Sequence, residues 1–189
     1  MSNIKATRNE SKVTTGKVRL SYTHLFEPSA MEGQEPKYST AILIPKTDTD
    51  TLKAIKEAVE LAKKNGASKW NGKVPPNLKT PLRDGDIERP DDEVYAGCYF
   101  LNASSKNKPG VVDQNVQPIL DATEVYSGCY ARVTLNFYAY NANGNKGIAA
   151  GLGNVQKLAE GEPLGGFTRA EDDFGAVAST GADDDDFLS

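Results

Sequence analysis

The sequence predicts a mainly β protein, a small antiparallel β-barrel with one inserted helix and a disordered C-terminal tail. Three observations indicate this class. Five or six short segments have the composition of strands, one early segment has helical periodicity, and the C-terminal residues lack any apolar pattern. A parallel α/β sheet would require helices between successive strands, and the sequence shows none there. The 189 residues, of which 38% are hydrophobic, suffice for one domain and a further segment.

Two predicted strands precede the helix. In residues 17–26, KVRLSYTHLF, the alternation places on one face Val18, Leu20, Tyr22, His24 and Phe26. Residues 37–44, KYSTAILI, are rich in β-branched side chains, and Pro45 ends them. Both segments are therefore predicted to be strands.

The predicted helix covers about residues 48–65. Residues 47–50, TDTD, offer several N-cap side chains, and Gly66 supplies the stop. One apolar stripe runs along the segment, formed by Leu52, Ile55, Val59 and Ala62. We expect this stripe to pack on a sheet.

Two aromatic-rich strands are predicted after the helix, around residues 94–103 and 125–140. The stretch before them, 67–93, has lost its periodicity and contains four prolines. The two strands share a short echo, VYAGCY at 94–99 and VYSGCY at 125–130. The echo predicts similar local surroundings for both.

Three further elements complete the predicted barrel. Residues 116–120 are expected to form a short strand. Residues 141–147, NANGNKG, contain the Asn-Gly pair that hairpin turns favour. The strand after this turn should run over 148–158.

The net charge of −4 hides a basic body and an acidic tail. Residues 170–189 hold seven of the 26 acidic residues and no Lys or Arg, so 19 acidic and all 22 basic residues remain before them. Such asymmetry indicates nucleic-acid binding or an interaction tail. The C-terminal segment holds too little apolar surface to offset the entropy of ordering. We therefore predict an ordered domain over 1–167 and a disordered acidic tail over 168–189.

No membrane segment is expected, because no run of about 18 apolar residues exists. The N-terminus, MSNIKATRNESK, is polar and lacks the apolar part of a secretory signal. These features predict a cytoplasmic protein.

Catalytic motifs find little support in the sequence. The single histidine, His24, lies on an apolar strand face, where a packed side chain is the usual role. Cys98 and Cys129 form no CxxC and have no histidine cluster, so they are expected to be buried thiols without zinc. A disulfide between them would require neighbouring strands. We expect neither a metal nor another cofactor.

The richest carboxylate cluster lies in the segment Asp84–Glu93, DGDIERPDDE. One alternative for the protein is a metal-dependent nuclease with Mg²⁺ in this loop. The spacing does not match an EF-hand loop, and no second carboxylate group is evident elsewhere. A solvated loop is the favoured interpretation.

Binding of a polyanion is better supported. No acidic residue lies between Lys63 and Arg83, and the only tryptophan, Trp70, stands in the middle. The segment is either a basic surface loop with one anchoring Trp, or a site where Trp70 stacks on a base and basic side chains contact phosphates. The phosphate-contacting candidates here are Lys63, Lys64, Lys69, Lys73, Lys79 and Arg83.

The strand over 130–140 adds a second candidate surface. One face is plain core, and the opposite face mixes Arg132, Thr134 and Asn136 with tyrosines. Tyrosines and polar groups together can stack on bases and form hydrogen bonds, although strands favour tyrosine for structural reasons too. The stacking candidates are Tyr130, Tyr138, Tyr140 and, through the echo, Tyr99. Lys106, Lys108 and Arg132 are further phosphate-contacting candidates.

The tail carries a phenylalanine after each of its two acidic runs. A solubility tail does not require this, so we expect a partner-binding segment at Asp183, Asp184, Asp185, Asp186 and Phe187. The same carboxylates could occupy the basic surface of the chain itself when nucleic acid is absent.

Several separated blocks resemble one known family, the bacteriophage single-stranded DNA-binding proteins that were formerly a domain of unknown function. The resemblance covers roughly residues 10–165. Its blocks are PLRDGD at 81–86, FLNASSK at 100–106, PGVVD at 109–113, YSGCY at 126–130, GIAAGL at 147–152 and VQK at 155–157.

The resemblance implies an OB-fold β-barrel that coats ssDNA during phage DNA replication or recombination in the host cytoplasm. The tail resembles the acidic C-termini of replicative single-strand binders, which implies replication or recombination proteins as partners. Leu188 and Ser189 follow Phe187, where the bacterial form ends on the aromatic residue.

The hypothesis is therefore a sequence-tolerant, non-enzymatic ssDNA-binding protein, and a homo-oligomer stays compatible with the sequence. The alternatives are the nuclease already described and a structural or adaptor phage protein that binds no DNA.

Overall fold

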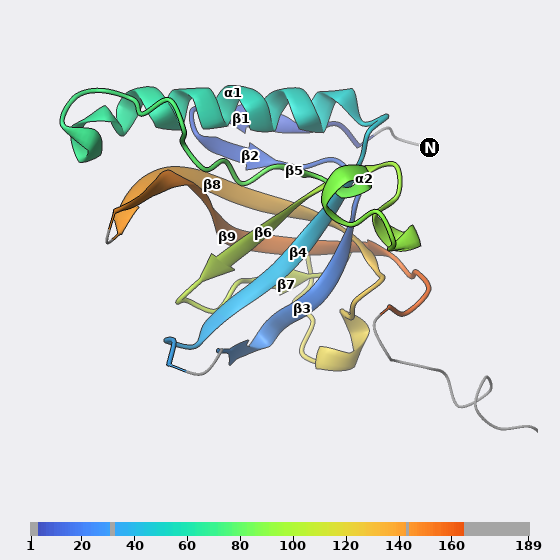
Figure 1. Cartoon of the computed structure of the whole chain (residues 1–189). Helices are drawn as coiled ribbons and strands as arrows, with labels where there is room; N and C mark the ends of the chain where they lie inside the picture. The colour runs from blue at the N-terminus through green and yellow to red at the C-terminus, as the bar shows by residue number, and fades with distance from the viewer. Residues whose placement is uncertain (1–3, 31–32, 143, 165–189) are drawn as a thin grey trace, which may run out of the picture.

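The computed structural model describes residues 4–30, 33–142 and 144–164 (Figure 1). Its strands are β1 (Thr7–Asn9), β2 (Lys12–Thr14), β3 (Val18–Ser29), β4 (Lys37–Pro45), β5 (Arg83–Asp84), β6 (Cys98–Ser105), β7 (Val111–Val112), β8 (Tyr130–Ala142) and β9 (Asn145–Ala159). The helices are α1 (Thr49–Asn65) and α2 (Gly85–Glu88), with 3-10 turns η1 (Ala67–Trp70), η2 (Glu93–Tyr95) and η3 (Ala122–Glu124). The predicted tail, 168–189, lies outside the described residues.

The long strands pair into a closed ring. β3 pairs with β4, β4 with β6, β8 with β9 and β8 with β3, all antiparallel, and β6 pairs with β9 in parallel. The short strands β1 and β2 extend the sheet beside β8. The ring encloses the main core, and α1 lies along one side of it (Figure 1). The predicted OB-fold-like, mainly β architecture is confirmed.

Helix α1 forms where the sequence predicts it. The Asp48 carboxylate accepts a hydrogen bond from the backbone N–H of Thr51 (3.2 Å), which caps the helix start. At its end, the Gly66 N–H donates to the Ala62 carbonyl (2.9 Å). The predicted apolar stripe is buried against the sheet core. Only glycine fits at position 66, because a Cβ there would lie 2.1 Å from the Cβ of Ala139 on β8.

The predicted hairpin is confirmed between β8 and β9, which pair from Ala142 and Asn145 down to Tyr130 and Ala159. Gly144 of the predicted turn directly precedes β9 and has φ +84°. That conformation is easy for glycine and costly for most other residues.

The predicted face of β3 is only half correct. Val18 and Leu20 are buried, but Tyr22 is 56% exposed and His24 is exposed, while Leu25 is buried instead. The pairing with β4 shifts register between Ser21 and His24, and Tyr22 has φ +48°. This bulge reverses the alternation, so the prediction is wrong beyond Ser21.

The echo segments do not begin as strands: the one at 94–99 begins within η2, and the one at 125–130 directly follows η3. η2 and η3 each precede a glycine of positive φ, Gly97 (+70°) and Gly128 (+118°), after which β6 and β8 start. The two segments share this glycine conformation, but their surroundings differ, because Cys129 is buried in the main core whereas Cys98 is half-buried beside the separate cluster of Tyr95 and Phe100. The predicted strand starts at 94 and 125 are wrong. The strand predicted over 116–120 is wrong too, because only Pro118 forms a single bridge there, to Val112.

Among the described residues, no helix has the length and apolar character needed to cross a membrane.

Candidate nucleic-acid interface

The outer face of β8 is the first part of the site. Along this strand the odd-numbered residues from Ala131 to Ala139 are buried, and the even-numbered ones are half-buried or exposed. The predicted division into a core face and a polar, aromatic face is confirmed. Tyr138 is 42% exposed, and a Cβ at Gly151 of β9 would lie only 3.5 Å from its Cε1. The ring edge therefore lies over a strand position without a side chain.

Three hollows on the outside of the ring join into one outer groove. The β8–β9 hollow, about 300 Å³, shares Ser104 with the β4–β6 hollow, about 710 Å³. The β4–β6 hollow shares Tyr22 and His24 with the β3 hollow, about 950 Å³. The outer groove thus runs from β8 across β9, β6 and β4 to β3. The exposed Tyr138 lies at its β8 end, and the exposed Tyr22 lies where the β4–β6 hollow meets the β3 hollow.

Tyr22 stands where the β3 hollow meets the β4–β6 hollow. The bulge in β3 turns its ring outward, and its left-handed backbone is uncommon for a bulky residue. Backbone strain of this kind persists where the surrounding structure holds it, and it often occurs at binding sites. The fold therefore presents an aromatic side chain at the centre of the outer groove.

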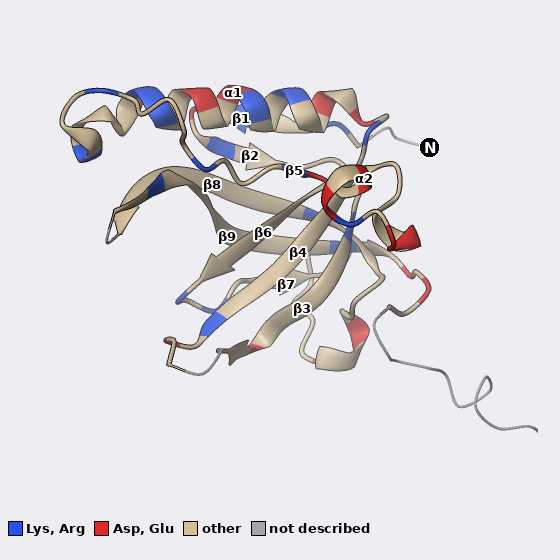
Figure 2. Cartoon of the chain, viewed as in Figure 1, with Lys and Arg blue, Asp and Glu red and all other residues tan. Residues whose placement is uncertain are grey.

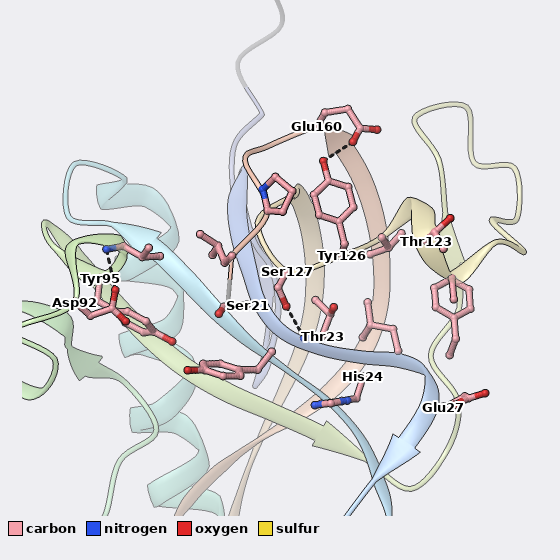
Figure 3. Close-up of a pocket in the computed structure, with 18 residues that line it drawn as sticks. Ser21, Thr23, His24, Glu27, Asp92, Tyr95, Thr123, Tyr126, Ser127 and Glu160 are labelled. Carbon is pink, nitrogen blue, oxygen red and sulfur yellow. Dashed lines mark hydrogen bonds between the residues drawn. The ribbon is translucent and has the colours of Figure 1, made fainter. Parts of the chain in front are cut away.

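The β3 hollow is bordered by the two echo tyrosines (Figure 3). Tyr95 lies on one side of β3 and Tyr126 on the other, where its hydroxyl contacts the carboxylate of Glu160. Burial raises the pKa of the Tyr126 phenol, and Glu160 raises it further. Ser127 accepts a hydrogen bond from the Thr23 N–H (3.2 Å), which fixes the wall of the hollow.

Basic side chains lie in or next to the outer groove. Lys37 lines the β4–β6 hollow and Lys12 lines the β8–β9 hollow. The predicted Lys106 and Lys108 lie in the turn after β6. Lys106 pairs with Glu35 of the β4–β6 hollow (3.2 Å), and the Lys108 ammonium lies 5.6 Å from the ring centre of Phe26 in the β3 hollow. Figure 2 shows basic residues near the ends of β4 and β6, as well as on α1 and the loop after it.

Trp70 does not stack on a ligand, and this prediction is wrong. Its side chain is 3% exposed within the main core. Its indole N–H donates to the backbone carbonyl of Tyr140 (3.1 Å). The indole ring packs there because its apolar area is large and its one donor finds a partner. Trp70 anchors the loop after α1, the structural alternative for this segment.

The basic residues around Trp70 form a surface away from the outer groove. Lys63 and Lys64 end α1, where Lys63 pairs with Glu60 (2.9 Å). The Lys69 ammonium donates a hydrogen bond to the Ala139 carbonyl (2.9 Å), which links the loop after α1 to the β8–β9 hairpin. The structure does not bring these residues beside the tyrosines of the outer groove. Lys73 is exposed on the loop, Lys79 bridges to Gly147 of β9, and Arg83 pairs with Glu88 (2.9 Å).

The other aromatic candidates do not line the outer groove. Tyr99 packs against the main core with the Lys46 ammonium 5.2 Å from its ring centre, so its predicted place on the outer face is wrong. Tyr130 is half-buried, and the Lys17 ammonium lies 4.9 Å from the centre of its ring. Tyr140 is half-buried, and its hydroxyl would lie 2.7 Å from a Cβ at Gly147.

Arg132 is used inside the chain. Its guanidinium donates to the carbonyl oxygens of Thr15 and Lys5, both at 2.9 Å. These bonds hold the N-terminal segment against β8 and leave the guanidinium half-buried. Its predicted contact with phosphate is therefore not supported by the geometry.

Four of the six carboxylates in the Asp84–Glu93 loop, those of Asp84, Asp86, Glu88 and Asp92, are engaged in structural contacts. The Lys46 ammonium lies 2.8 Å from Asp84 and 2.7 Å from Asp86, and these contacts raise the pKa of Lys46. The hydrogen bond from Lys46 lowers the pKa of Asp86. Asp92 accepts from the Val94 N–H (3.0 Å) at the start of η2. In the described part of the chain, no three metal-ligating side chains gather.

Both cysteines are free thiols. Cys129 is fully buried in the main core, and Cys98 is half-buried under η2. Burial raises the pKa of both thiols. Cys98 begins β6 and Cys129 directly precedes β8. These two strands are separated in the ring by β9, so the neighbouring strands that a disulfide requires are not present.

Sequence reasoning misses Tyr22, His24, Lys12 and Lys37 as groove residues. The alternation predicts a packed His24, but the bulge exposes it in two hollows. One signal points to the bulge, because Leu25 and Phe26 are adjacent apolar residues that interrupt the alternation. Lys12 lies at the site because β2 pairs with β8, and no local sequence pattern predicts this pairing.

A closed five-strand ring with an open groove on its outer face defines the OB-fold class, whose strand face and loops bind oligonucleotides or oligosaccharides. A family model described as "Enterobacter phage Enc34, ssDNA-binding protein" matches residues 11–188. The chain belongs to this family of phage ssDNA-binding proteins, as the resemblance predicted.

Individual relatives agree with this assignment. Putative protein p50 of Acyrthosiphon pisum secondary endosymbiont phage 1 is 36% identical over 175 residues, which cover 86% of this chain and 92% of the relative. The solved ssDNA-binding protein of bacteriophage Enc34, in complex with ssDNA, is 30% identical with a TM-score of 0.75, over 87% of this chain and 99% of that chain. The ssDNA-binding protein gp2.5 of bacteriophage T7, 17% identical with a TM-score of 0.60 over 89% and 98%, shares the fold.

Proposed function

We propose that the protein binds ssDNA along the outer groove, without sequence preference, and coats it during phage DNA replication or recombination. The observation that carries this proposal is the pair of exposed tyrosines, Tyr22 and Tyr138, on one groove that basic side chains accompany. Family membership and the solved relative in complex with ssDNA support the nature of the ligand.

The physical basis is stacking combined with phosphate neutralisation. An aromatic ring contributes about 1–3 kcal/mol per stacked base and accepts any base, because every base has a π face. Lys12, Lys37, Lys106 and Lys108 would face the phosphates. Such contacts release counterions and make affinity strongly salt-dependent.

No catalytic role is part of this proposal. Of the carboxylates that a nuclease would use, Asp84 and Asp86 are engaged by Lys46, and Asp92 is engaged by a backbone N–H group. This arrangement supports a binding protein over the nuclease alternative.

The deciding experiment measures fluorescence anisotropy of a labelled dT oligonucleotide with wild type, Tyr138→Ala and Tyr138→Phe. We expect Tyr138→Ala to weaken binding about 5- to 150-fold, which corresponds to 1–3 kcal/mol, and Tyr138→Phe to retain most affinity. A wild-type protein that fails to bind the oligonucleotide at low salt would overturn the proposal. Equal affinity of all three proteins would overturn the placement of the DNA.

We further propose that the acidic tail over 168–189 competes with DNA and recruits replication or recombination proteins. The charge division of the sequence supports this, because the tail is acidic and residues 1–169 carry an excess of basic residues. Deleting residues 170–189 should strengthen ssDNA binding at low salt, since seven competing charges are removed. Weaker binding by the truncated chain would contradict competition.

A further inference from the structure

Two surfaces on opposite sides of the ring have opposite charge and exposed apolar side chains, and the first of them borders the β3 hollow at Ala122 and Thr123. The first, here called the acidic loop, covers residues 113–124 between β7 and the end of η3. Leu120 is 89% exposed and Val116 is 65% exposed. The loop has no Lys or Arg, and its acidic members are Asp113, Asp121 and Glu124.

The acidic loop is held in a defined shape. The Asp113 carboxylate accepts hydrogen bonds from the backbone N–H groups of Asn115 (2.8 Å) and Gln117 (3.0 Å). Ile119 is buried, and its N–H donates to the Val111 carbonyl (2.9 Å). Little conformational entropy remains to be lost when a partner covers Leu120.

The second surface, here called the basic hollow, lies on α1 and the loop after it. Its volume is about 770 Å³, and its apolar side chains are Leu61 and Val74, which is 44% exposed. Arg8, Lys56, Lys63 and Lys64 outnumber its two carboxylates, Glu57 and Glu60. Lys69 and Lys73 follow in a stretch, 61–83, that has no acidic residue.

The two surfaces lie on opposite sides of the ring. In Figure 1, α1 lies along the upper side, and η3, drawn in yellow, lies at the lower side. The acidic loop therefore meets a basic hollow only on another molecule. A contact between two different patches repeats from copy to copy and builds an open chain rather than a closed dimer.

We propose that the acidic loop of one copy docks on the basic hollow of the next, so that copies associate head to tail along ssDNA. The occupant is a second copy of this chain because the charges are complementary and each surface offers an apolar contact. This inference rests on the proposed function, since DNA would hold neighbouring copies at high local concentration. A weak contact then suffices to produce cooperative binding.

The test compares affinity for a short dT oligonucleotide of about 12 nucleotides, which suits one OB-fold, with a dT strand several times longer. One variant reverses the acidic loop (Asp121→Lys/Glu124→Lys), and another reverses the basic hollow (Lys64→Glu/Lys73→Glu). Wild type should bind the long strand cooperatively, on the order of ten- to hundredfold more tightly per copy. Each variant alone should lose this gain when its affinity for the long strand is compared with its own affinity for the short oligonucleotide, a comparison needed because the acidic loop borders the β3 hollow.

An equimolar mixture of the two variants provides the sharpest arm. In an alternating chain, each reversed loop meets a reversed hollow and each native loop meets a native hollow, so cooperativity should return. A further variant, Leu120→Ser, removes the exposed apolar side chain of the acidic loop. Two control variants carry the same changes elsewhere: Asp91→Lys/Glu93→Lys for the charge reversal, and Ile87→Ser for the apolar change, since Ile87 is 74% exposed. The controls should keep the cooperative gain of the wild type, measured against their own affinity for the short oligonucleotide, whereas Leu120→Ser should lose it.

The outcomes separate this inference from the proposed function. Length-independent affinity of wild type, or a mixture that stays non-cooperative, would overturn head-to-tail association while ssDNA binding stands. Cooperativity that vanishes on deleting residues 170–189 but survives both loop and hollow variants would assign the contact to the tail and overturn it too. Failure to bind even the short oligonucleotide would overturn the proposed function itself.

Discussion

The indole N–H of Trp70 donates to the backbone carbonyl of Tyr140 across 3.1 Å. This bond connects the loop after α1 to the hairpin of β8 and β9, and the Lys69 ammonium adds a second connection at Ala139. The loop that the sequence marks as basic and aromatic is therefore built around a buried anchor. Its lysines remain at the surface, on the opposite side of the ring from the acidic loop.

Replacing Trp70 by alanine should reduce the free energy of unfolding by about 3–5 kcal/mol, because a large buried side chain leaves a cavity. Urea unfolding followed by far-UV circular dichroism measures this. In wild type, the Trp fluorescence should change little when ssDNA is added, since the indole is buried away from the outer groove. Strong quenching by DNA, together with unchanged stability of the variant, would contradict the buried anchor.

Tyr22 allows backbone strain and stacking to be separated. Tyr22→Ala and Tyr22→Gly both remove the ring, so both should weaken ssDNA binding by about 1–3 kcal/mol. Only glycine accepts the φ of +48° without cost, so Tyr22→Gly should be more stable than Tyr22→Ala by about 1 kcal/mol. Thermal unfolding and anisotropy on the same proteins measure the two effects. Equal stability of the variants would count against strain at the bulge.

The basic residues of the outer groove should determine the salt dependence. Replacing Lys37, Lys106 and Lys108 with glutamine should reduce the slope of log affinity against log salt by about 0.7 for each phosphate that is no longer neutralised. The matched control is replacement of Lys63, Lys64 and Lys73, which lie on the basic hollow and its loop. These should leave the slope on a short oligonucleotide unchanged. The reverse pattern would move the DNA to the α1 side.

The ion pairs of Lys46 predict an acid-sensitive contribution to stability. The folded-state pKa of Asp86 is lowered by its hydrogen bond from Lys46, so the contribution is complete above the unfolded pKa of about 3.9. It is lost as pH falls through the lowered folded pKa. Asp86→Asn should therefore lower the melting temperature at pH 7, and its difference from wild type should shrink below pH 3.9. A difference that stays constant with pH would show that the charge is not involved, and Asp91→Asn serves as the exposed control.

Elements with strong local signals could be predicted from the sequence. The stripe of α1, the Asn-Gly turn and the alternation of β8 each depend on neighbours a few residues away, and all three are confirmed. The blocks that resemble phage single-strand binders indicated the family, which the matched model confirms.

The placement of the site required the tertiary structure. The burial of Trp70 depends on a bond to a residue 70 positions later in the chain, and the exposure of Tyr22 depends on a register shift against β4. The outer groove exists because β6, β8 and β9 meet in one ring. Ser104 of β6 then lines both the β8–β9 hollow and the β4–β6 hollow. Local periodicity decides which side of a strand is apolar, whereas long-range pairing decides which polar side chains become neighbours, and only the latter brings Tyr138, Lys12 and Tyr22 to one surface.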